Sequence, residues 1–168
     1  MARSPVMNFM KQQGFAQEPP DRAALRFKGL QFQPTVVGSM MLVAILTQSP
    51  AIFLLFSAIL WLNTFVPAAN PFENFYNRFV ARRHGRPPLT PAPGPRRFAQ
   101  GVAAVFMLAA GLTLLQGWRA ASYVFQGLLV VAFAALLLGK FCLGAYVYHL
   151  LKGNVALANG TCPWSDSA

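Results

Sequence analysis

Apolar residues dominate three long stretches of the chain, and the charged residues are confined to the segments between them. No Asp, Glu, Lys or Arg occurs at positions 29–72, 98–118 or 120–139. A membrane-spanning helix needs about 20 apolar residues to cross roughly 30 Å of hydrocarbon, so the last two stretches fit one span each. The first stretch is too long for one span and is interrupted by Gln48-Ser49-Pro50, a turn signal. The pattern predicts four helices, at about 31–47, 50–67, 98–116 and 120–140, the last continuing to about 151.

Four such helices, joined in pairs by short polar turns, predict an all-α membrane protein with four transmembrane helices arranged as two hairpins. The aqueous segments between and around the hairpins are longer, and one of them is rich in proline. We therefore expect the following order along the chain: an N-terminal tail at 1–28, a first hairpin at 29–69, an amphipathic helix with a Pro-rich linker at 70–97, a second hairpin at 98–151, and a C-terminal tail at 152–168.

The placement of positive charge predicts the orientation of these spans. Only 11% of the residues are charged, against about 25% in ordinary soluble domains, and the formal net charge is +10. Four spans would put both tails, the middle loop and the end of the last span on one side. These parts hold 13 of the 14 Lys and Arg residues, including Lys140 at the span end, and only Arg119 falls on the other side. The positive-inside rule then places both termini in the cytoplasm. Because insertion explains the basic charge, we expect membrane lipids as partners and no nucleic acid.

The middle loop begins with a pattern typical of an amphipathic helix. Asn70 is a predicted N-cap, with Pro71 at the first helical position and Glu73 at the third. Aromatic residues then recur at helical spacing and arginines follow, which predicts a helix in the cytoplasmic interface, with its rings among lipid head groups. The alternative is a docking face for an acidic partner. The residues predicted to form this lipid or partner interface are Phe72, Phe75, Tyr76, Arg78, Phe79, Arg82 and Arg83.

Candidate chemistry is concentrated at the end of the last apolar stretch, in GKFCLGAYVYHLLKG at 139–153. Cys142, Tyr146 and His149 fall at i, i+4 and i+7, which is one face of a continuous helix. A thiol close to lysines at an interface can have a lowered pKa and react. The alternative is that Cys142 is a buried apolar residue, with Tyr146 and His149 as interfacial anchors. Cys162, in the C-terminal segment, is the other candidate thiol.

Other patterns of catalysis or metal binding are missing from the sequence. The four acidic residues are not spaced as a general acid and base, and there is no phosphate-binding loop or nucleophile elbow. The chain has two cysteines and two histidines, as many residues as a zinc site has ligands, but they lack the paired spacing of such a site. They are Cys142, Cys162, His84 and His149. His149 could ligate a pigment or haem, although an interfacial anchor explains it more simply. We therefore predict no metal and no cofactor.

Four short motifs, in a fixed order, resemble a bacterial membrane family catalogued as domain of unknown function 4395. They are RFKG at 26–29, NPFENFYNRF at 70–79, RFAQGVAAVF at 97–106 and FCLGAYVY at 141–148. The resemblance implies a small bacterial inner-membrane protein and does not imply a biochemical role. In that family the last motif often holds a second thiol three residues after the first, and here Ala145 stands at that position. Either a dithiol activity is missing from this chain or Cys162 supplies the second thiol.

These observations favour a non-catalytic protein over an enzyme, namely an accessory or assembly subunit that packs in a larger membrane complex. Small residues on the predicted spans, such as Gly38, Ala104 and Gly111, allow helices to approach closely. None of the predicted spans has an ionisable residue at its centre, as pumps and ion pathways usually need. Two alternatives stay open: a thiol-dependent redox or sulfur-handling protein that uses Cys142 with Cys162, and a small-solute transporter.

Overall fold

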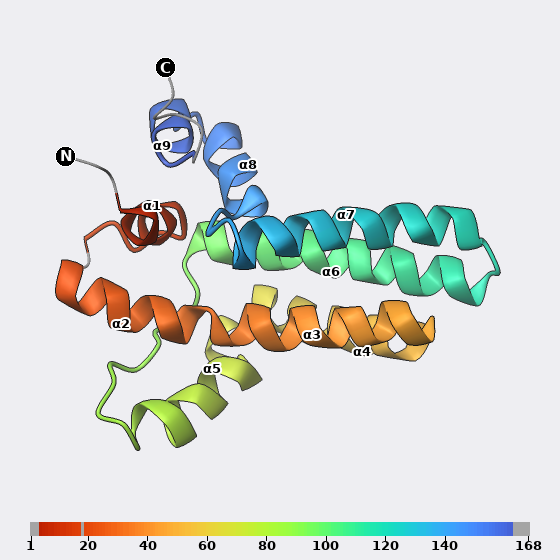
Figure 1. The fold of residues 1–168 in the computed structure, drawn as a ribbon, viewed down its shortest axis with the longest axis horizontal. Coiled ribbons are helices and arrows are strands. Elements are labelled where there is room, and N and C mark those ends of the chain that lie inside the picture. Colours follow the sequence, from red (N-terminus) through yellow and green to blue (C-terminus); the bar gives the residue numbers. More distant parts are fainter. Residues whose placement is uncertain (1–3, 18, 163–168) are drawn as a thin grey trace.

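The computed structural model describes residues 4–17 and 19–162, with only the backbone described for Pro20 and Asp21. The predicted tails 1–28 and 152–168 extend beyond these limits, and the acidic residues Glu18 and Asp166 lie outside them. The described residues form helices and loops, without any strand (Figure 1). The helices are α1 (Pro5–Gln12), α2 (Pro20–Leu30), α3 (Phe32–Thr47), α4 (Pro50–Phe65), η1 (Pro67–Ala69), α5 (Pro71–Phe75), η2 (Tyr76–Ala81), α6 (Gly94–Leu115), α7 (Arg119–Leu137), α8 (Leu143–Leu151) and α9 (Val155–Gly160).

The long helices α3, α4, α6 and α7 lie over the four segments that the apolar pattern predicts, and they run alongside one another in Figure 1. The two-residue turn between α3 and α4 and the three-residue turn between α6 and α7 lie at the same end of the molecule. The shorter helices α1, α5, α8 and α9 gather at the opposite end. Pro50 starts α4 at a position where its missing N–H costs no hydrogen bond, and Gln48, with φ 47°, reverses the chain before it.

Among the described residues, three helices are long and apolar enough to cross a membrane: Arg22–Thr47, in which α2 and α3 follow one another, Gly94–Leu115 and Arg119–Leu137. The apolar helix α4 has 16 residues. At 1.5 Å per residue it rises about 24 Å, which is short of the roughly 30 Å hydrocarbon core. The coarse prediction of an all-helical protein with helices able to span a membrane is therefore confirmed, whereas four clear spans are not seen in the described residues.

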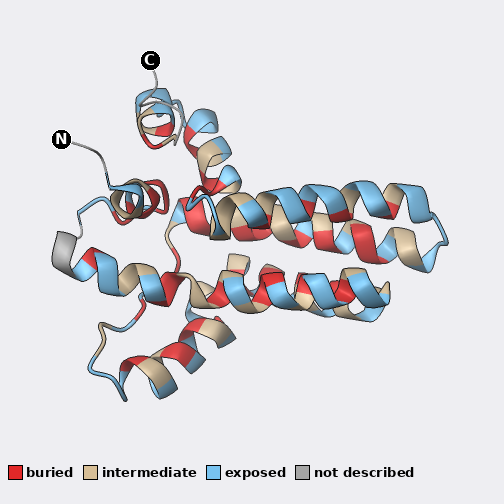
Figure 2. Ribbon diagram, viewed as in Figure 1, coloured by how far each residue is buried: buried red, intermediate tan, exposed pale blue. Residues whose placement is uncertain are grey.

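Small residues and hydroxyls mediate the contacts between the long helices. Gly111 of α6 lies so close to α4 that a Cβ there would meet Leu54 Cγ at 3.0 Å. The Ser57 hydroxyl of α4 donates to Ala104 O of α6 at 2.8 Å, and the Ser122 hydroxyl of α7 donates to Ala110 O of α6 at 3.0 Å. Such bonds satisfy polar groups inside an apolar bundle, where water is not available. α6 therefore lies at the centre of the packing, and the buried residues line the faces between helices in Figure 2.

The prediction that the last apolar helix continues to about residue 151 is wrong. α7 ends at Leu137, and Lys140 adopts a left-handed conformation with φ 50°. The Phe141 N–H donates to Ala135 O at 3.0 Å, six residues back, which closes the helix end. A Cβ on Gly139 would stand 2.7 Å from Ala135 O, so glycine is needed in this turn. Cys142 is consequently not in α7 but is the residue before α8.

The amphipathic helix of the middle loop forms in two parts. Asn70 caps α5 as predicted, because its Oδ1 accepts from the N–H groups of Phe72 at 3.0 Å and Glu73 at 3.4 Å. The backbone then widens into the π-helical segment η2, which begins at Tyr76. Tyr76 points inward, with only 3% of its surface exposed, and packs in a core cluster with Phe9 and Leu30. Tyr76 therefore does not share the exposed face of Phe75 and Phe79.

The N-terminal segment is more than a tail, because α1 packs into the protein. Phe9 and Met10 are 1% and 0% exposed and belong to a core cluster with Leu30 and Tyr76. The Gln12 side chain is also buried, at 1% exposure. α1 thereby covers the end of the bundle at which α8 starts.

Candidate functional site

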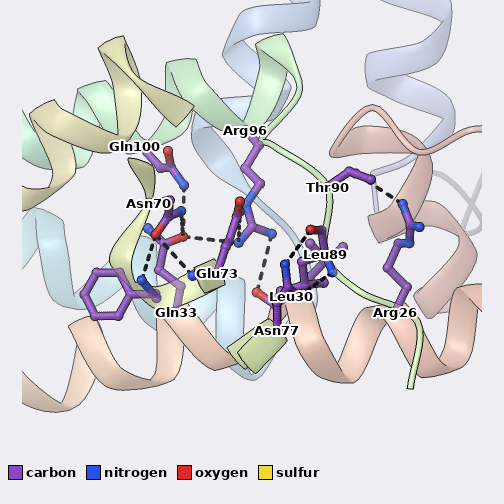
Figure 3. A network of polar contacts seen from close by, with 11 residues as sticks. Arg26, Leu30, Gln33, Asn70, Glu73, Asn77, Leu89, Thr90, Arg96 and Gln100 are labelled. Carbon is purple, nitrogen blue, oxygen red and sulfur yellow. Dashed lines mark hydrogen bonds and ion pairs between the residues drawn. The ribbon is translucent and has the colours of Figure 1, made fainter. Parts of the chain in front are cut away.

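Buried polar side chains join α3, α5 and α6 at the end of the bundle near the middle loop (Figure 3). The Arg96 guanidinium, in the first turn of α6, lies 3.6 Å from Glu73 Oε1 of α5. It also donates to Gln33 Oε1 of α3 at 3.3 Å. Gln33 Oε1 accepts two further hydrogen bonds, from Asn70 Nδ2 and Gln100 Nε2, each at 3.1 Å. One amide oxygen therefore connects three helices, and we call these five residues the polar cluster.

The polar cluster contains charged groups that are buried. Glu73 and Arg96 are each 4% exposed, and Glu73 Oε1 accepts no hydrogen bond from the described residues. Burial raises the pKa of the Glu73 carboxyl, because the ionised form loses its hydration, and the Arg96 charge lowers it only in part. The Arg96–Glu73 pair therefore contains one cation and one carboxyl group with a higher pKa than a carboxyl group in water.

Cys142 lies beside this cluster and carries a free thiol that is 5% exposed. Burial raises the pKa of the thiol. The N–H groups of Ala145 and Gly144 at the start of α8, the Gln13 side chain and the Arg96 charge all act in the opposite direction without outweighing burial. The thiol form of Cys142 therefore prevails at neutral pH.

α1 holds Cys142 and His149 in place through Gln12. The Cys142 N–H donates to Gln12 Oε1 at 2.8 Å. The His149 Nε2–H donates to the Gln12 backbone oxygen at 2.9 Å, while His149 Nδ1 is buried without a partner among the described residues. Tyr146 differs from both, since its hydroxyl donates to Asn159 Oδ1 at 3.3 Å in an exposed contact. Cys142 and His149 are thus brought together, and Tyr146 is separate from them.

A cavity of about 370 Å³ lies between α3, α6, α7 and α8. Gln33, Arg96 and Gln100 of the polar cluster line it, and so does Cys142. The rest of its wall is mainly apolar, with residues such as Val37, Ala103, Phe106, Leu129 and Phe133. The volume lies in the range of about 300–1,000 Å³ that is typical of small-molecule sites.

The other sequence-predicted site residues lie away from this cavity. Phe75 and Phe79 are 51% and 53% exposed, with their ring centroids 4.8 Å apart, and the nearby Arg78, Arg82 and Arg83 are exposed. Phe72 is half-buried against the core, and Tyr76 is inside. Cys162 is partly buried after α9, a helix that packs on α8 and α1. Among the described residues, no three His, Cys, Asp or Glu side chains could hold a metal ion together, and His84 is exposed.

Sequence reasoning missed Arg96, Gln33 and Gln100 as site residues. Arg96 reads as one of several loop arginines, and only its position three residues after Pro93 marks the start of α6. The two glutamines stand just inside apolar stretches, where a polar amide needs a partner within the protein. The presence of Gln33 and Gln100 within apolar stretches was therefore the sequence feature from which a buried polar cluster could have been predicted.

The helical architecture, the three helices of the described residues that are able to cross a bilayer, and a cavity with a polar end are those of a helical membrane protein whose spans are candidates by length and composition. The model of the family described as Domain of unknown function (DUF4395) matches residues 27–152. This match covers most of the chain, so the chain belongs to that family. Comparison with curated proteins and comparison with solved structures each give no match.

Proposed function

We propose that the protein is a non-catalytic subunit of the bacterial inner membrane that packs beside other membrane proteins. The observation that carries this proposal is the open outer face of α7. In its apolar window 22% of the residues are buried inside the chain, against 33% for α6. Gly127, in the middle of α7, has no atom within 4 Å of the place where a Cβ would stand. A small exposed residue on a span gives a second helix room to approach closely.

The proposed topology has four crossings with both termini in the cytoplasm, and α4 acts as a short fourth span. A span shorter than the hydrocarbon thickness can be accommodated by local thinning of the bilayer. The arrangement agrees with the 13 of 14 Lys and Arg residues that it places on one side. In it, the exposed Phe75 and Phe79 would enter the interface and the neighbouring arginines would contact lipid phosphates.

Photo-crosslinking in native membranes tests the subunit role. A photoreactive amino acid is placed at Gly127 and, as a control, at Leu46 of α3, which is 84% exposed. We expect a single protein adduct from position 127, recovered with the tagged chain in mild detergent, and mainly lipid adducts from position 46. A lone monomer in several detergents, without a protein adduct at position 127, would overturn the proposal.

Thiol-dependent redox or sulfur handling is the second candidate, and the position of Cys142 at the cavity favours it. In that role the Cys142 thiolate would attack a disulfide of a partner protein and release one of its thiols. Cys162 would then resolve the mixed disulfide, leaving a Cys142–Cys162 disulfide and a reduced partner. Mass analysis after incubation of membranes with a disulfide donor tests this chemistry, and a chain that never forms the Cys142–Cys162 link excludes it.

A further inference from the structure

The polar end of the internal cavity is not saturated with hydrogen bonds. Gln100 Oε1 is buried and has no partner among the described residues. Gln33 accepts three hydrogen bonds at Oε1, and none of the contacts within the described part of the chain uses its Nε2 donor. Arg96 contacts Leu30 O, Gln33 Oε1 and Glu73 Oε1, which engage at most three of its five N–H donors. The cavity end therefore offers spare donors and a spare acceptor.

These three side chains are built into the protein rather than displayed on its surface. Gln33 and Arg96 are each 4% exposed and Gln100 is 8% exposed, yet all three line the cavity. They come from α3 and α6, which the polar cluster ties together (Figure 3). Leaving a buried polar group without a partner is unfavourable, so a bound molecule that completes these hydrogen bonds would be favoured. Beyond this end the wall is mainly apolar and suits a hydrocarbon tail.

The charge of the polar end limits the head group that fits. Arg96 already contacts Leu30 O, Gln33 Oε1 and Glu73 Oε1, so it keeps about two free N–H donors, too few to pair with all the oxygens of a phosphate group. A neutral carboxyl group matches the unused hydrogen-bond donors and acceptor, because its C=O can accept from Arg96 or Gln33 and its O–H can donate to Gln100 Oε1. Burial also favours the neutral form of an acid. A volume of about 370 Å³ is near the lower end of small-molecule sites and suits one chain rather than the two of a phospholipid.

We propose that this cavity binds a free long-chain carboxylic acid, with its head at Gln33, Arg96 and Gln100 and its tail along the apolar walls of α3, α6 and α7. The site is distinct from the subunit role, since its polar end is formed by buried residues of α3 and α6 and its lining does not include Gly127. The acid would enter from the bilayer, in which such single-chain amphiphiles partition.

Competition binding with the purified full chain in detergent tests the proposal. Radiolabelled palmitic acid is the probe, and the competitors are hexadecanol, hexadecane and a lysophospholipid. We expect unlabelled palmitic acid to compete best, hexadecanol less well, and hexadecane about tenfold more weakly or worse, because it makes no bond to the polar end. Equal competition by hexadecane would show apolar adsorption only, and stronger competition by the lysophospholipid would assign the site to a lipid head group. Either result overturns the proposal.

Two variants locate the binding inside the cavity. Gln100→Met removes the spare acceptor at similar size and should weaken palmitic acid binding about tenfold. Ala103→Phe fills the apolar wall and should abolish binding. Gln116→Met, at the exposed end of the same helix, is the matched control and should bind like the unaltered protein. The proposal would be contradicted if both cavity variants bind palmitic acid with unchanged affinity and thermal unfolding shows that they are folded. If a variant does not fold, the competitor series decides the proposal.

Discussion

Arg96 of α6 and Glu73 of α5 face one another across 3.6 Å inside the protein. This ion pair fixes the start of the middle loop to the first turn of α6. The interfacial segment with Phe75 and Phe79 follows directly after Glu73 in the chain. The position and direction of the interfacial segment relative to the bundle therefore depend on the buried Arg96–Glu73 ion pair.

Removing the cation should destabilise the protein strongly. We expect Arg96→Gln to lower the free energy of unfolding by about 3 kcal/mol at pH 7, because it leaves the Glu73 carboxylate buried without its partner. Denaturant titration in mild detergent, followed by circular dichroism, measures the change. The double variant Glu73→Gln/Arg96→Gln should recover part of the loss. The control is Arg97→Gln, which removes the neighbouring charge and the bond from Arg97 Nε to Thr64 O of 2.8 Å, at a cost of about 1 kcal/mol. Equal losses in both single variants would contradict the role of the pair.

Glu73 should make stability depend on pH. Its pKa is raised above the ordinary 4.5 by burial, so the folded protein binds this proton more tightly than the unfolded chain does. The stabilising contribution is complete below about pH 4.5 and is lost as the pH rises through the folded-state pKa. The unaltered protein should therefore lose stability relative to Glu73→Gln as the pH increases over that range. A difference between the two proteins that stays flat, or that changes in the opposite direction, would exclude a raised pKa.

The Cys142 thiol should react slowly in the folded protein. Because burial raises its pKa and restricts access, we expect alkylation by N-ethylmaleimide at pH 7 to be at least about tenfold slower than after unfolding in strong detergent. The rate should rise with pH only in the alkaline range. Mass analysis of the Cys162→Ser variant assigns the product to Cys142. Rapid alkylation at neutral pH would refute this expectation and favour the thiol-dependent candidate.

Gly144 should be indispensable for the packing of α8 on α6. A Cβ at this position would lie 2.7 Å from both Cα and Cβ of Ala99, and a backbone atom cannot give way cheaply. We expect Gly144→Ala to reduce the thermal midpoint, with a loss of about 1–3 kcal/mol. Gly127→Ala is the matched control within the second pair of long helices. Its Cβ would meet no atom within 4 Å, so it should be neutral or stabilise the helix by up to about 1 kcal/mol.

The apolar pattern predicts the long helices well, because a helix surrounded by hydrocarbon or protein needs apolar side chains at most of its positions. The pattern cannot reveal where α7 stops, since Leu136, Leu137 and Leu138 continue the apolar run to its end. The break depends on Gly139 and on the left-handed Lys140, which are local backbone signals that hydropathy does not contain. A glycine followed by a basic residue is typical of a helix end, so Gly139 and Lys140 could have predicted that α7 stops there.

The site was predictable only in part. Cys142 attracts attention as a thiol, and Asn70 as a helix cap, from local sequence alone. The contact of Gln33 with Arg96 and Gln100 joins residues more than sixty positions apart, and no periodicity indicates which buried amide meets which charge. The inward position of Tyr76 similarly depends on distant residues, because its ring packs in a core cluster with Phe9 and Leu30.

The hydrogen bond from the Cys142 N–H to Gln12 also sets an order of assembly. The two residues are 130 positions apart, so α1 leaves the ribosome early and Gln12 must wait for the start of α8 before it can form this bond. During this interval Phe9 and Met10 can already pack against Leu30 and Tyr76, but the C-terminal end of α1 is not yet covered by α8. Closure over Cys142 is thus a late event that follows insertion of the helices. A nascent chain that is arrested before residue 142 should leave the C-terminal end of α1, around Gln12, more open to protease than the complete chain does.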